Sequence, residues 1–120
     1  MAVAGTASAQ EPSNAQAAFE RGMQAFKAGH NEQAIPALID AATKGKGNTR
    51  FYSEFYLARI YSESAGAMAD HTKAFVLFRK LADENAEVDP SENQRAPFVA
   101  KALIALASYT RAGLRDINLE

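Results

Sequence analysis

The sequence contains no cysteine and no tryptophan, and its 13 Lys and Arg nearly balance its 14 Asp and Glu. Without cysteine there are no disulfides, no thiolate catalysis and almost no route to a structural zinc site. A net charge of −1 provides no overall field that would attract nucleic acid or an anionic membrane. No apolar run approaches the roughly 18 residues of a membrane-spanning helix. We therefore expect neither nucleic-acid binding nor membrane insertion.

The residues that are present are typical of one folded domain. Hydrophobic residues make up 48% of the 120 and charged residues 22%, which is enough apolar surface to offset the ordering entropy of the chain. No segment alternates with period two and no hairpin-turn motif occurs, so strands are not expected. Apolar residues instead recur at helical spacing in five segments, 15–28, 32–44, 50–64, 71–86 and 94–111. The sequence predicts an all-α fold.

Glycine and capping residues separate these segments. Asn31 and Asp70 are expected to be the N-caps of the second and fourth helices. Glycine takes the left-handed position after a helix without a Cβ penalty, so the expected stops are Gly29, Gly45 with Gly47, Gly66 and Gly113.

The helices also repeat as pairs. Aligning the first pair with the second matches Gly22 with Ala58, Ala34 with Ala74, and Leu38 with Phe78. The small residues would let the two helices of a pair approach closely, and the bulky ones would fill the groove toward the next pair. The loop 64–70 holds the extra residues of the second unit.

This order of features resembles the Sel1-like branch of the tetratricopeptide superfamily, whose units carry such a loop with a glycine and a capping aspartate. The resemblance rests on Tyr56-Leu-Ala-Arg-Ile-Tyr61, Gly66, Asp70, Lys73-Ala-Phe75 and Phe78 to Ala82. It covers residues 15–116 and implies a right-handed α-α superhelix of antiparallel helix pairs, about two and a half repeats long. Residues 1–14 would then be a flexible tail and residues 117–120 a C-terminal tail whose Leu119-Glu120 is typical of a cloning scar.

Within that superfamily the chain is similar to the alphaproteobacterial exported regulators of exopolysaccharide synthesis, which are periplasmic and hold a membrane sensor kinase inactive. The similarity rests on Phe26-Lys-Ala-Gly29 followed by Ala34, and on Phe98 to Tyr109. It implies a non-enzymatic regulator that binds a protein. Ala7-Ser8-Ala9 fits the rule for signal-peptidase cleavage, which favours a periplasmic or secreted protein. An ordinary flexible N-terminus is the alternative, and the protein would then be cytoplasmic.

In the superfamily, the first helix of each pair lines a concave face on which peptides dock. By position, the resemblance assigns to this face Gln16, Phe19, Met23, Phe26 and Lys27, then Tyr52, Phe55, Arg59 and Ser62, then Leu103, Ala107 and Arg111. Aromatic residues, Met and Arg are enriched in binding hot spots, and Arg59 is expected to anchor a carboxylate. The alternative is that several of these rings pack between the repeat units.

Two and a half units are few, since a solenoid needs about three units to bury a continuous core. The fifth helix would be the first helix of a pair whose second helix is missing. Its apolar side would cap the fourth helix or meet another chain, through Phe98, Ala102, Leu103 and Leu106. Either the chain is a fragment of a longer array, or it forms a homodimer through the last helix and acts as a structural scaffold.

No pattern predicts an enzyme. His30 and His71 are far apart in sequence, outside any H-E-x-x-H motif, and both are expected to be solvated. The basic stretch 44–50 lacks Walker spacing and is expected to be an inter-helix loop. We expect no catalytic residues, no metal site and no cofactor.

Overall fold

The computed structural model describes residues 14–87, 94–115 and 117–119, and within these ranges it contains five α-helices and no strand. The elements are α2 (Asn14–Lys27), α3 (Asn31–Lys44), α4 (Gly47–Glu63), the short 3₁₀ turn η1 (Gly66–Met68), α5 (His71–Glu84) and α6 (Ala96–Arg111). The predicted all-α class is confirmed.

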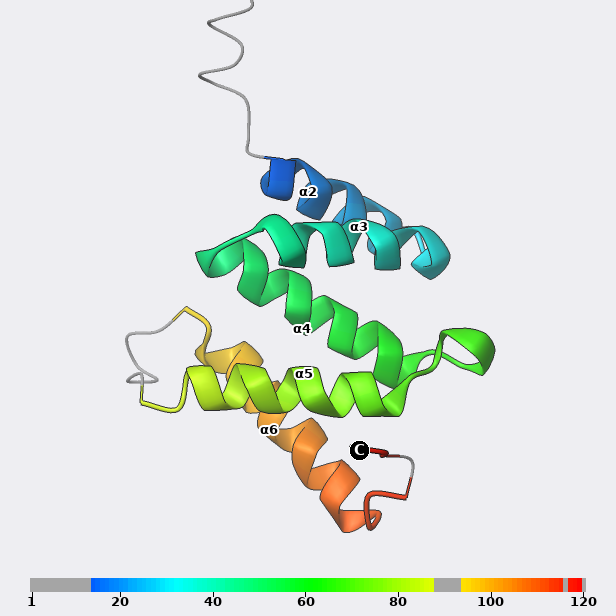
Figure 1. Cartoon of the computed structure of the whole chain (residues 1–120), viewed down its shortest axis with the longest axis vertical. Coiled ribbons are helices and arrows are strands. Elements are labelled where there is room, and N and C mark those ends of the chain that lie inside the picture. The colour runs from blue at the N-terminus through cyan, green and yellow to red at the C-terminus, as the bar shows by residue number, and fades with distance from the viewer. Residues whose placement is uncertain (1–13, 88–93, 116, 120) are drawn as a thin grey trace, which may run out of the picture.

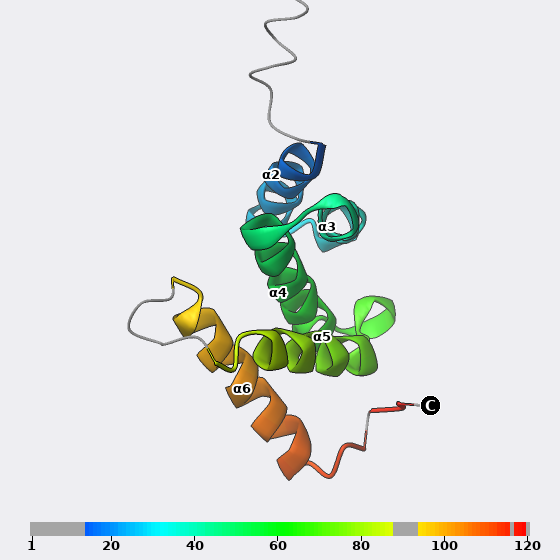
Figure 2. The same ribbon diagram turned by 60° about the vertical axis from the view of Figure 1, so that its left-hand side comes forward.

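The helices follow one another in chain order along the long axis of the molecule (Figures 1 and 2). Each packs against the next, α2 on α3, α3 on α4, α4 on α5 and α5 on α6, and α2 also touches α4. Short connections favour such packing between neighbours in sequence. Helix α4 therefore lies in the middle and contacts α2, α3 and α5.

Helix α4 is buried around most of its circumference. Its buried residues are Phe51, Ser53, Glu54, Phe55, Leu57, Ala58, Ile60 and Tyr61. A helix with apolar residues on every side must lie inside the fold. Among its buried residues, Glu54 is the charged one, and its carboxylate accepts hydrogen bonds from Lys80 Nζ at 2.5 Å and Arg50 Nε at 3.4 Å. These two cations compensate the buried charge.

The first helix pair packs closely because Gly22 of α2 has no side chain. A Cβ at Gly22 would lie 2.7 Å from both Cγ and Cδ2 of Leu38 in α3. Leu38 and Ala34 are fully buried there, which confirms the predicted close approach. The bulky residues also pack within their own pairs, since Leu38 lies over Gly22 and Phe78 contacts Phe55. Phe78 in addition lines a hollow with Lys101 and Ala105 of α6, on the side of the next unit, as predicted.

Two helices end as the glycines predict. Gly29 has a φ of +81°, its N–H donates to the carbonyl of Phe26, and the N–H of His30 donates to the carbonyl of Ala25 at 2.8 Å. This is a Schellman motif, and Gly113, with a φ of +80°, ends α6 in the same way. The N-cap prediction for Asn31 is wrong. His30 precedes α3 and its carbonyl accepts the first helical bonds, because the Schellman turn leads directly into the next helix.

Three helix boundaries differ by two or three residues from the predicted ones. Helix α4 begins at Gly47, earlier than the predicted residue 50, because Gly45 alone ends α3 with its N–H bonded to the carbonyl of Ala41. Helix α5 ends at Glu84, before the predicted residue 86, where the Asn85 side chain donates to the carbonyl of Leu81. Helix α6 begins at Ala96, later than residue 94, which puts its proline in the first turn.

The loop between α4 and α5 contains the predicted N-cap of α5. The two terminal segments differ in part from the flexible tails that the sequence predicted. Asp70 Oδ1 accepts a hydrogen bond from the N–H of Lys73 at 3.0 Å, which confirms Asp70 as the N-cap of α5. Asn14, assigned to the N-terminal tail, begins α2, and residues 1–13 lie outside the described residues. In the C-terminal tail, the N–H of Asn118 donates to Thr72 Oγ1 at 2.9 Å, so this segment lies against α5.

The contact between Gly22 and Leu38 generates a stability prediction. We expect Gly22→Ala to lower the free energy of unfolding, by up to about 3 kcal/mol, because Leu38 is fully buried and has no room to move. In a Leu38→Ala background the same change should raise stability, by about 1 kcal/mol, because the clash is gone and alanine is the better helix former. Urea unfolding of the parent, the two single variants and the double variant measures both effects. If Gly22→Ala has the same effect in both backgrounds, the two residues are not in close contact.

Candidate functional site

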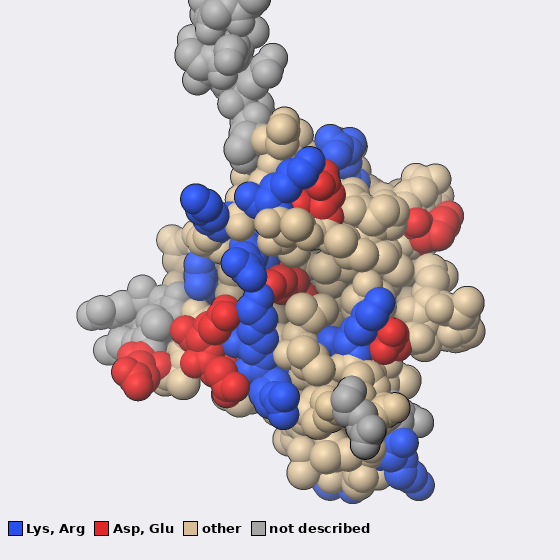
Figure 3. Space-filling model, in the orientation of Figure 1, with Lys and Arg blue, Asp and Glu red and all other residues tan. Residues whose placement is uncertain are grey.

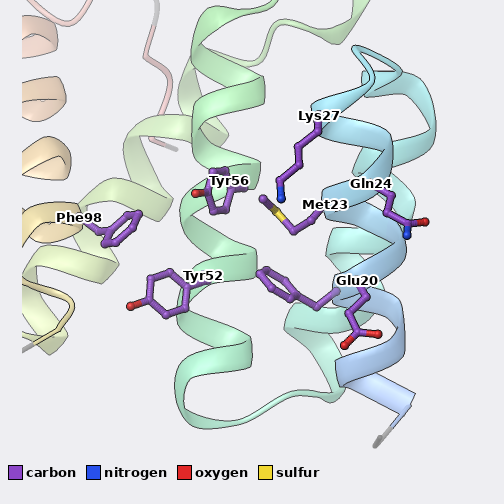
Figure 4. Close-up of a pocket in the computed structure, with 8 residues that line it drawn as sticks. Glu20, Met23, Gln24, Lys27, Tyr52, Tyr56 and Phe98 are labelled. Atoms are coloured by element: carbon purple, nitrogen blue, oxygen red, sulfur yellow. The ribbon is translucent and has the colours of Figure 1, made fainter.

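The first helices of the successive pairs, α2, α4 and α6, enclose a groove on one side of the molecule (Figure 4). We call this the aromatic groove. It has a volume of about 540 Å³ and is lined by Phe19, Glu20, Met23, Gln24 and Lys27 of α2, Tyr52 and Tyr56 of α4, and Phe98 of α6. Four aromatic rings and a methionine thus form a largely apolar floor, and charged side chains from α2 lie at its edge.

Three of the four rings that line the groove, Tyr52, Tyr56 and Phe98, belong to a continuous series of touching rings. In order of contact, the series is Phe51, Tyr52, Phe98, Phe55, Tyr56 and Phe26, with centroid separations between 4.9 and 5.3 Å. Most of these pairs are edge-to-face, which is a favourable geometry for aromatic quadrupoles. The series links all three helices, so each wall of the groove is held by the same contacts.

Cations lie over three of these rings. Arg95 is 4.6 Å from the centroid of Phe51, Arg59 is 5.5 Å from that of Phe26, and Lys101 is 5.7 Å from that of Phe98. Each such contact contributes about 0.5–1 kcal/mol at an exposed site. The rings therefore also fix the positions of positive charges around the groove.

A smaller hollow of about 290 Å³ adjoins the aromatic groove, since Phe98 of the groove contacts Phe55 of the hollow at 5.0 Å. Its lining residues are Phe55, Arg59, Ser62, Glu63, Phe78, Lys101 and Ala105. Arg59 Nε and Nη2 donate to the two carboxylate oxygens of Glu63 at 3.1 and 3.3 Å. A carboxylate from a partner would have to compete with Glu63 for this guanidinium.

The eight residues predicted to bind a partner come together on this one side. Phe19, Met23, Lys27 and Tyr52 line the aromatic groove, and Phe55, Arg59 and Ser62 line the hollow. Phe26 lies between them, touching Tyr56 and carrying Arg59 on its ring. Phe55 is only 1% exposed, so it forms the floor of the hollow and packs in the core.

On the last helix, the residues that line the two cavities are not the predicted ones. Leu103, Ala107 and Arg111 are exposed and line neither cavity, whereas Phe98, Lys101 and Ala105 do. The sequence placed four residues on the apolar side of this helix. Ala102 lies in the core, and Phe98 and Leu106 pack against it, whereas Leu103 is 53% exposed. The face of α6 that packs on α4 and α5 is therefore not the face that the resemblance implied. Gln16, another residue assigned to this face, accepts a hydrogen bond from Thr49 Oγ1 at the start of α4.

Sequence reasoning also missed several residues of these cavities. They are Glu20, Gln24, Tyr56 and Phe98 in the groove, and Glu63, Phe78, Lys101 and Ala105 in the hollow. Helical spacing was a usable signal for Tyr56, which lies four residues after Tyr52 on the same face. No sequence signal marks Phe98, because its position depends on how α6 packs on α4.

One histidine differs from the expectation of a solvated ring. His71 Nδ1 lies 2.7 Å from the Tyr109 hydroxyl, and the two rings meet edge-to-face at 5.6 Å. The contact joins the start of α5 to the end of α6. Local sequence patterns could not predict it, because the two residues are 38 positions apart. His30 is exposed, as expected.

A second apolar cavity lies on the opposite side, between α3 and α5. It has a volume of about 400 Å³ and is lined by Ile39, Leu57, Tyr61, Thr72, Lys73, Val76 and Leu77. Figure 3 shows the face on which α3 and α5 lie in front, with uncharged residues covering much of the area between them. Tyr61 lies deep in this cavity. Its burial, and to a lesser degree the negative charge of Asp70, raises the pKa of its hydroxyl above the usual 10.0.

Across 14–87, 94–115 and 117–119, no three side chains of the types that ligate metals gather in one place. Within those ranges, no helix combines the length and the apolar character needed to cross a bilayer.

Comparison with known proteins identifies relatives over most of the chain. It is 33% identical over 100 residues to a protein named exopolysaccharide production negative regulator from Rhizobium meliloti (strain 1021), covering 83% of this chain and 35% of that protein. It is 32% identical over 96 residues to a protein of the same name from Rhizobium leguminosarum bv. viciae, covering 80% and 33%. The chain thus spans about a third of the length of these relatives. No family model matches the chain, and no solved structure matches it.

The raised pKa of Tyr61 predicts how stability changes at high pH. A tyrosine whose pKa is raised on folding contributes stability that is fully present below its unfolded pKa and is lost as the pH rises through the folded value. The parent should therefore lose more unfolding free energy than Tyr61→Phe as the pH rises above about 10. Urea unfolding at a series of pH values measures this difference. Tyr52→Phe, in the open groove, is the matched control, and parallel curves for the parent and Tyr61→Phe would contradict the prediction.

Proposed function

We propose that this chain is a non-enzymatic, protein-binding part of a negative regulator of exopolysaccharide production, and that a partner protein docks on the aromatic groove. The observation that carries the proposal is the convergence of α2, α4 and α6 on one groove whose floor is aromatic. The regulatory role is supported by the name shared by both relatives, which are similar to four-fifths of this chain.

The groove has the composition of a protein-binding surface. Half-buried Phe, Tyr and Met side chains supply the apolar contact area that binding hot spots use. Lys27 and Glu20 lie at its edge, seven residues apart on α2, so the edge carries both charge signs. Rings held by each other and by cations lose little conformational freedom when a partner binds.

We further propose that residues 15–116 form Sel1-like repeats, in which α2 with α3 and α4 with α5 are the two complete units and α6 begins a third. The Schellman turn after α2, the Asp70 cap and the close approach at Gly22 support this arrangement. The right-handed superhelix and the antiparallel pairing within each unit belong to this proposal.

Substitutions at the edge of the groove test the proposed binding surface. We expect Gln24→Glu with Lys27→Glu, made in the full-length gene of the source organism, to raise secreted exopolysaccharide several-fold. Both residues are exposed and line the groove, so the change makes its edge acidic without disturbing the core. Exopolysaccharide per cell is the measurement, with the abundance of the protein followed by immunoblot.

The matched control is Gln33→Glu with Lys46→Glu, which makes the same charge change at exposed positions outside the groove. It should leave exopolysaccharide at the parent level. If the groove variant also stays at that level, docking on the groove is wrong. If deletion of the whole gene leaves exopolysaccharide unchanged, the regulatory role itself is wrong.

We also propose that the protein acts in the periplasm, on the basis of the small-x-small pattern Ala7-Ser8-Ala9. Immunoblots of periplasmic and cytosolic fractions of the source cell should then find the protein in the periplasmic fraction. Recovery in the cytosol alone, with a periplasmic marker correctly separated, would contradict an exported regulator.

A further inference from the structure

The hollow beside the aromatic groove already holds a carboxylate. Its lining comes from α4, α5 and α6, so it lies between helices within the row. Arg59 Nε and Nη2 each donate to one carboxylate oxygen of Glu63, at 3.1 and 3.3 Å. This bidentate arrangement is the one in which a guanidinium recognises a carboxylate best. The hollow therefore accommodates a carboxylate at Arg59.

The Glu63 carboxylate is only weakly held in this position. The side chains of Arg59 and Glu63 are 35% and 60% exposed, and the two residues are four positions apart on one helix. Such exposed pairs contribute little, because water screens the charges and two flexible side chains must be ordered. Arg59 is also positioned by the ring of Phe26, whose centroid is 5.5 Å from its guanidinium carbon. A carboxylate from another protein can thus take the place of Glu63 at small cost.

A second cation lines the same hollow without a carboxylate of its own. Lys101 of α6 is exposed, and its ammonium nitrogen lies 5.7 Å from the centroid of the Phe98 ring. Within the described part of the chain, Lys101 forms no ion pair, whereas Arg59 is paired with Glu63. The described lining of the hollow thus contains two cations and one carboxylate. One further carboxylate would balance its charge.

Apolar surface lies next to these cations. Phe98, beneath Lys101, faces Tyr52 and Tyr56 across the aromatic groove (Figure 4). The hollow itself has the rings of Phe55 and Phe78 in its lining. A ligand that fits both cavities therefore carries a carboxylate close to an apolar side chain.

We propose that the hollow is a carboxylate-binding subsite. An Asp or Glu of the partner protein enters it, pairs with Lys101 and displaces Glu63 from Arg59, while a neighbouring apolar side chain of the partner occupies the aromatic groove. This inference rests on the proposed docking of a partner on the groove and names the chemistry of the segment that docks. It makes Lys101 the first anchor, because Arg59, the anchor expected from the sequence, is already paired.

An acidic polysaccharide also presents carboxylates, but it suits this surface less well than a polypeptide. The cations stand beside aromatic rings, so the ligand must bring apolar contact area together with negative charge. Neighbouring side chains of a polypeptide supply both, as in the hot spots of protein interfaces. We therefore infer that the ligand is an acidic segment of a protein.

Selection from a library of random displayed peptides on the whole chain tests the proposal. The selected peptides should contain Asp or Glu next to an aromatic or aliphatic residue. For one selected peptide, the counterpart with Asn and Gln in place of Asp and Glu should bind about fivefold more weakly in fluorescence anisotropy. Lys101→Gln should weaken binding of the acidic peptide about threefold, and Glu63→Gln should strengthen it about threefold because it frees Arg59.

Asp40 and Lys44 provide the matched controls. They form an ion pair at 3.1 Å between exposed side chains four positions apart on α3, and they line neither the groove nor the hollow. Asp40→Asn and Lys44→Gln change the net charge of the chain as Glu63→Gln and Lys101→Gln do. Both controls should leave the affinity for the acidic peptide unchanged. Circular dichroism checks that all variants stay helical.

Four outcomes would overturn the proposal. A selection that enriches no acidic peptide, or equal binding of the Asn and Gln counterpart, would remove the carboxylate. An affinity that does not rise in Glu63→Gln would mean that Glu63 does not occupy the subsite. Equal changes in the Asp40→Asn and Lys44→Gln controls would mean that only net charge matters.

The fourth outcome concerns the class of ligand. Oligogalacturonate that competes with the peptide and depends on Lys101 to the same extent would assign the subsite to acidic sugars. All these results are distinct from the exopolysaccharide measurement on the Gln24→Glu, Lys27→Glu variant, which tests docking on the groove itself.

Discussion

The burial of α4 is the constraint from which the rest of the arrangement follows. Phe51 and Phe55, four residues apart, point into the core and are 4% and 1% exposed. Tyr52 and Tyr56 are each one position further along, so the helical turn directs them toward α2 and α6. The aromatic stretch 51–56 thus divides into two core rings and two groove rings. The hydroxyl of tyrosine explains the division, because it retains access to water at a half-buried position.

The same helix also requires its neighbours to be close. Helix α2 packs tightly on α3 because Gly22 leaves room for Leu38, and this packing brings Phe26 against Tyr56 of α4. On the other side, Phe98 of α6 lies between Tyr52 and Phe55. The groove is therefore built from core packing and does not rest on loops. A surface supported in this way keeps its shape before a partner arrives, which lowers the entropy cost of binding.

Local sequence signals predicted the helices, and long-range packing decided what they could not predict. The Schellman glycine at residue 29 and the cap at Asp70 act over four or five residues, so the pattern alone located them. The groove residues on α2 and α4 were assigned by the resemblance to helical repeats, and they come together because each set follows one face of its helix. The rotation of α6 depends on Phe98 fitting between Tyr52 and Phe55, more than 40 residues earlier in the chain. His71 was mistaken for a solvated side chain for the same reason, since Tyr109 lies 38 residues away.

Helix α6 forms the third wall of the groove with few buried residues of its own. Its inner side supplies Phe98 to the aromatic groove, and its outer side exposes Leu103 and Ile104. Ala102 is its one fully buried residue in the described structure, so α6 is held by fewer core contacts than α4. Phe98, which contacts both Tyr52 and Phe55, is the side chain that joins this wall to the rings of α4.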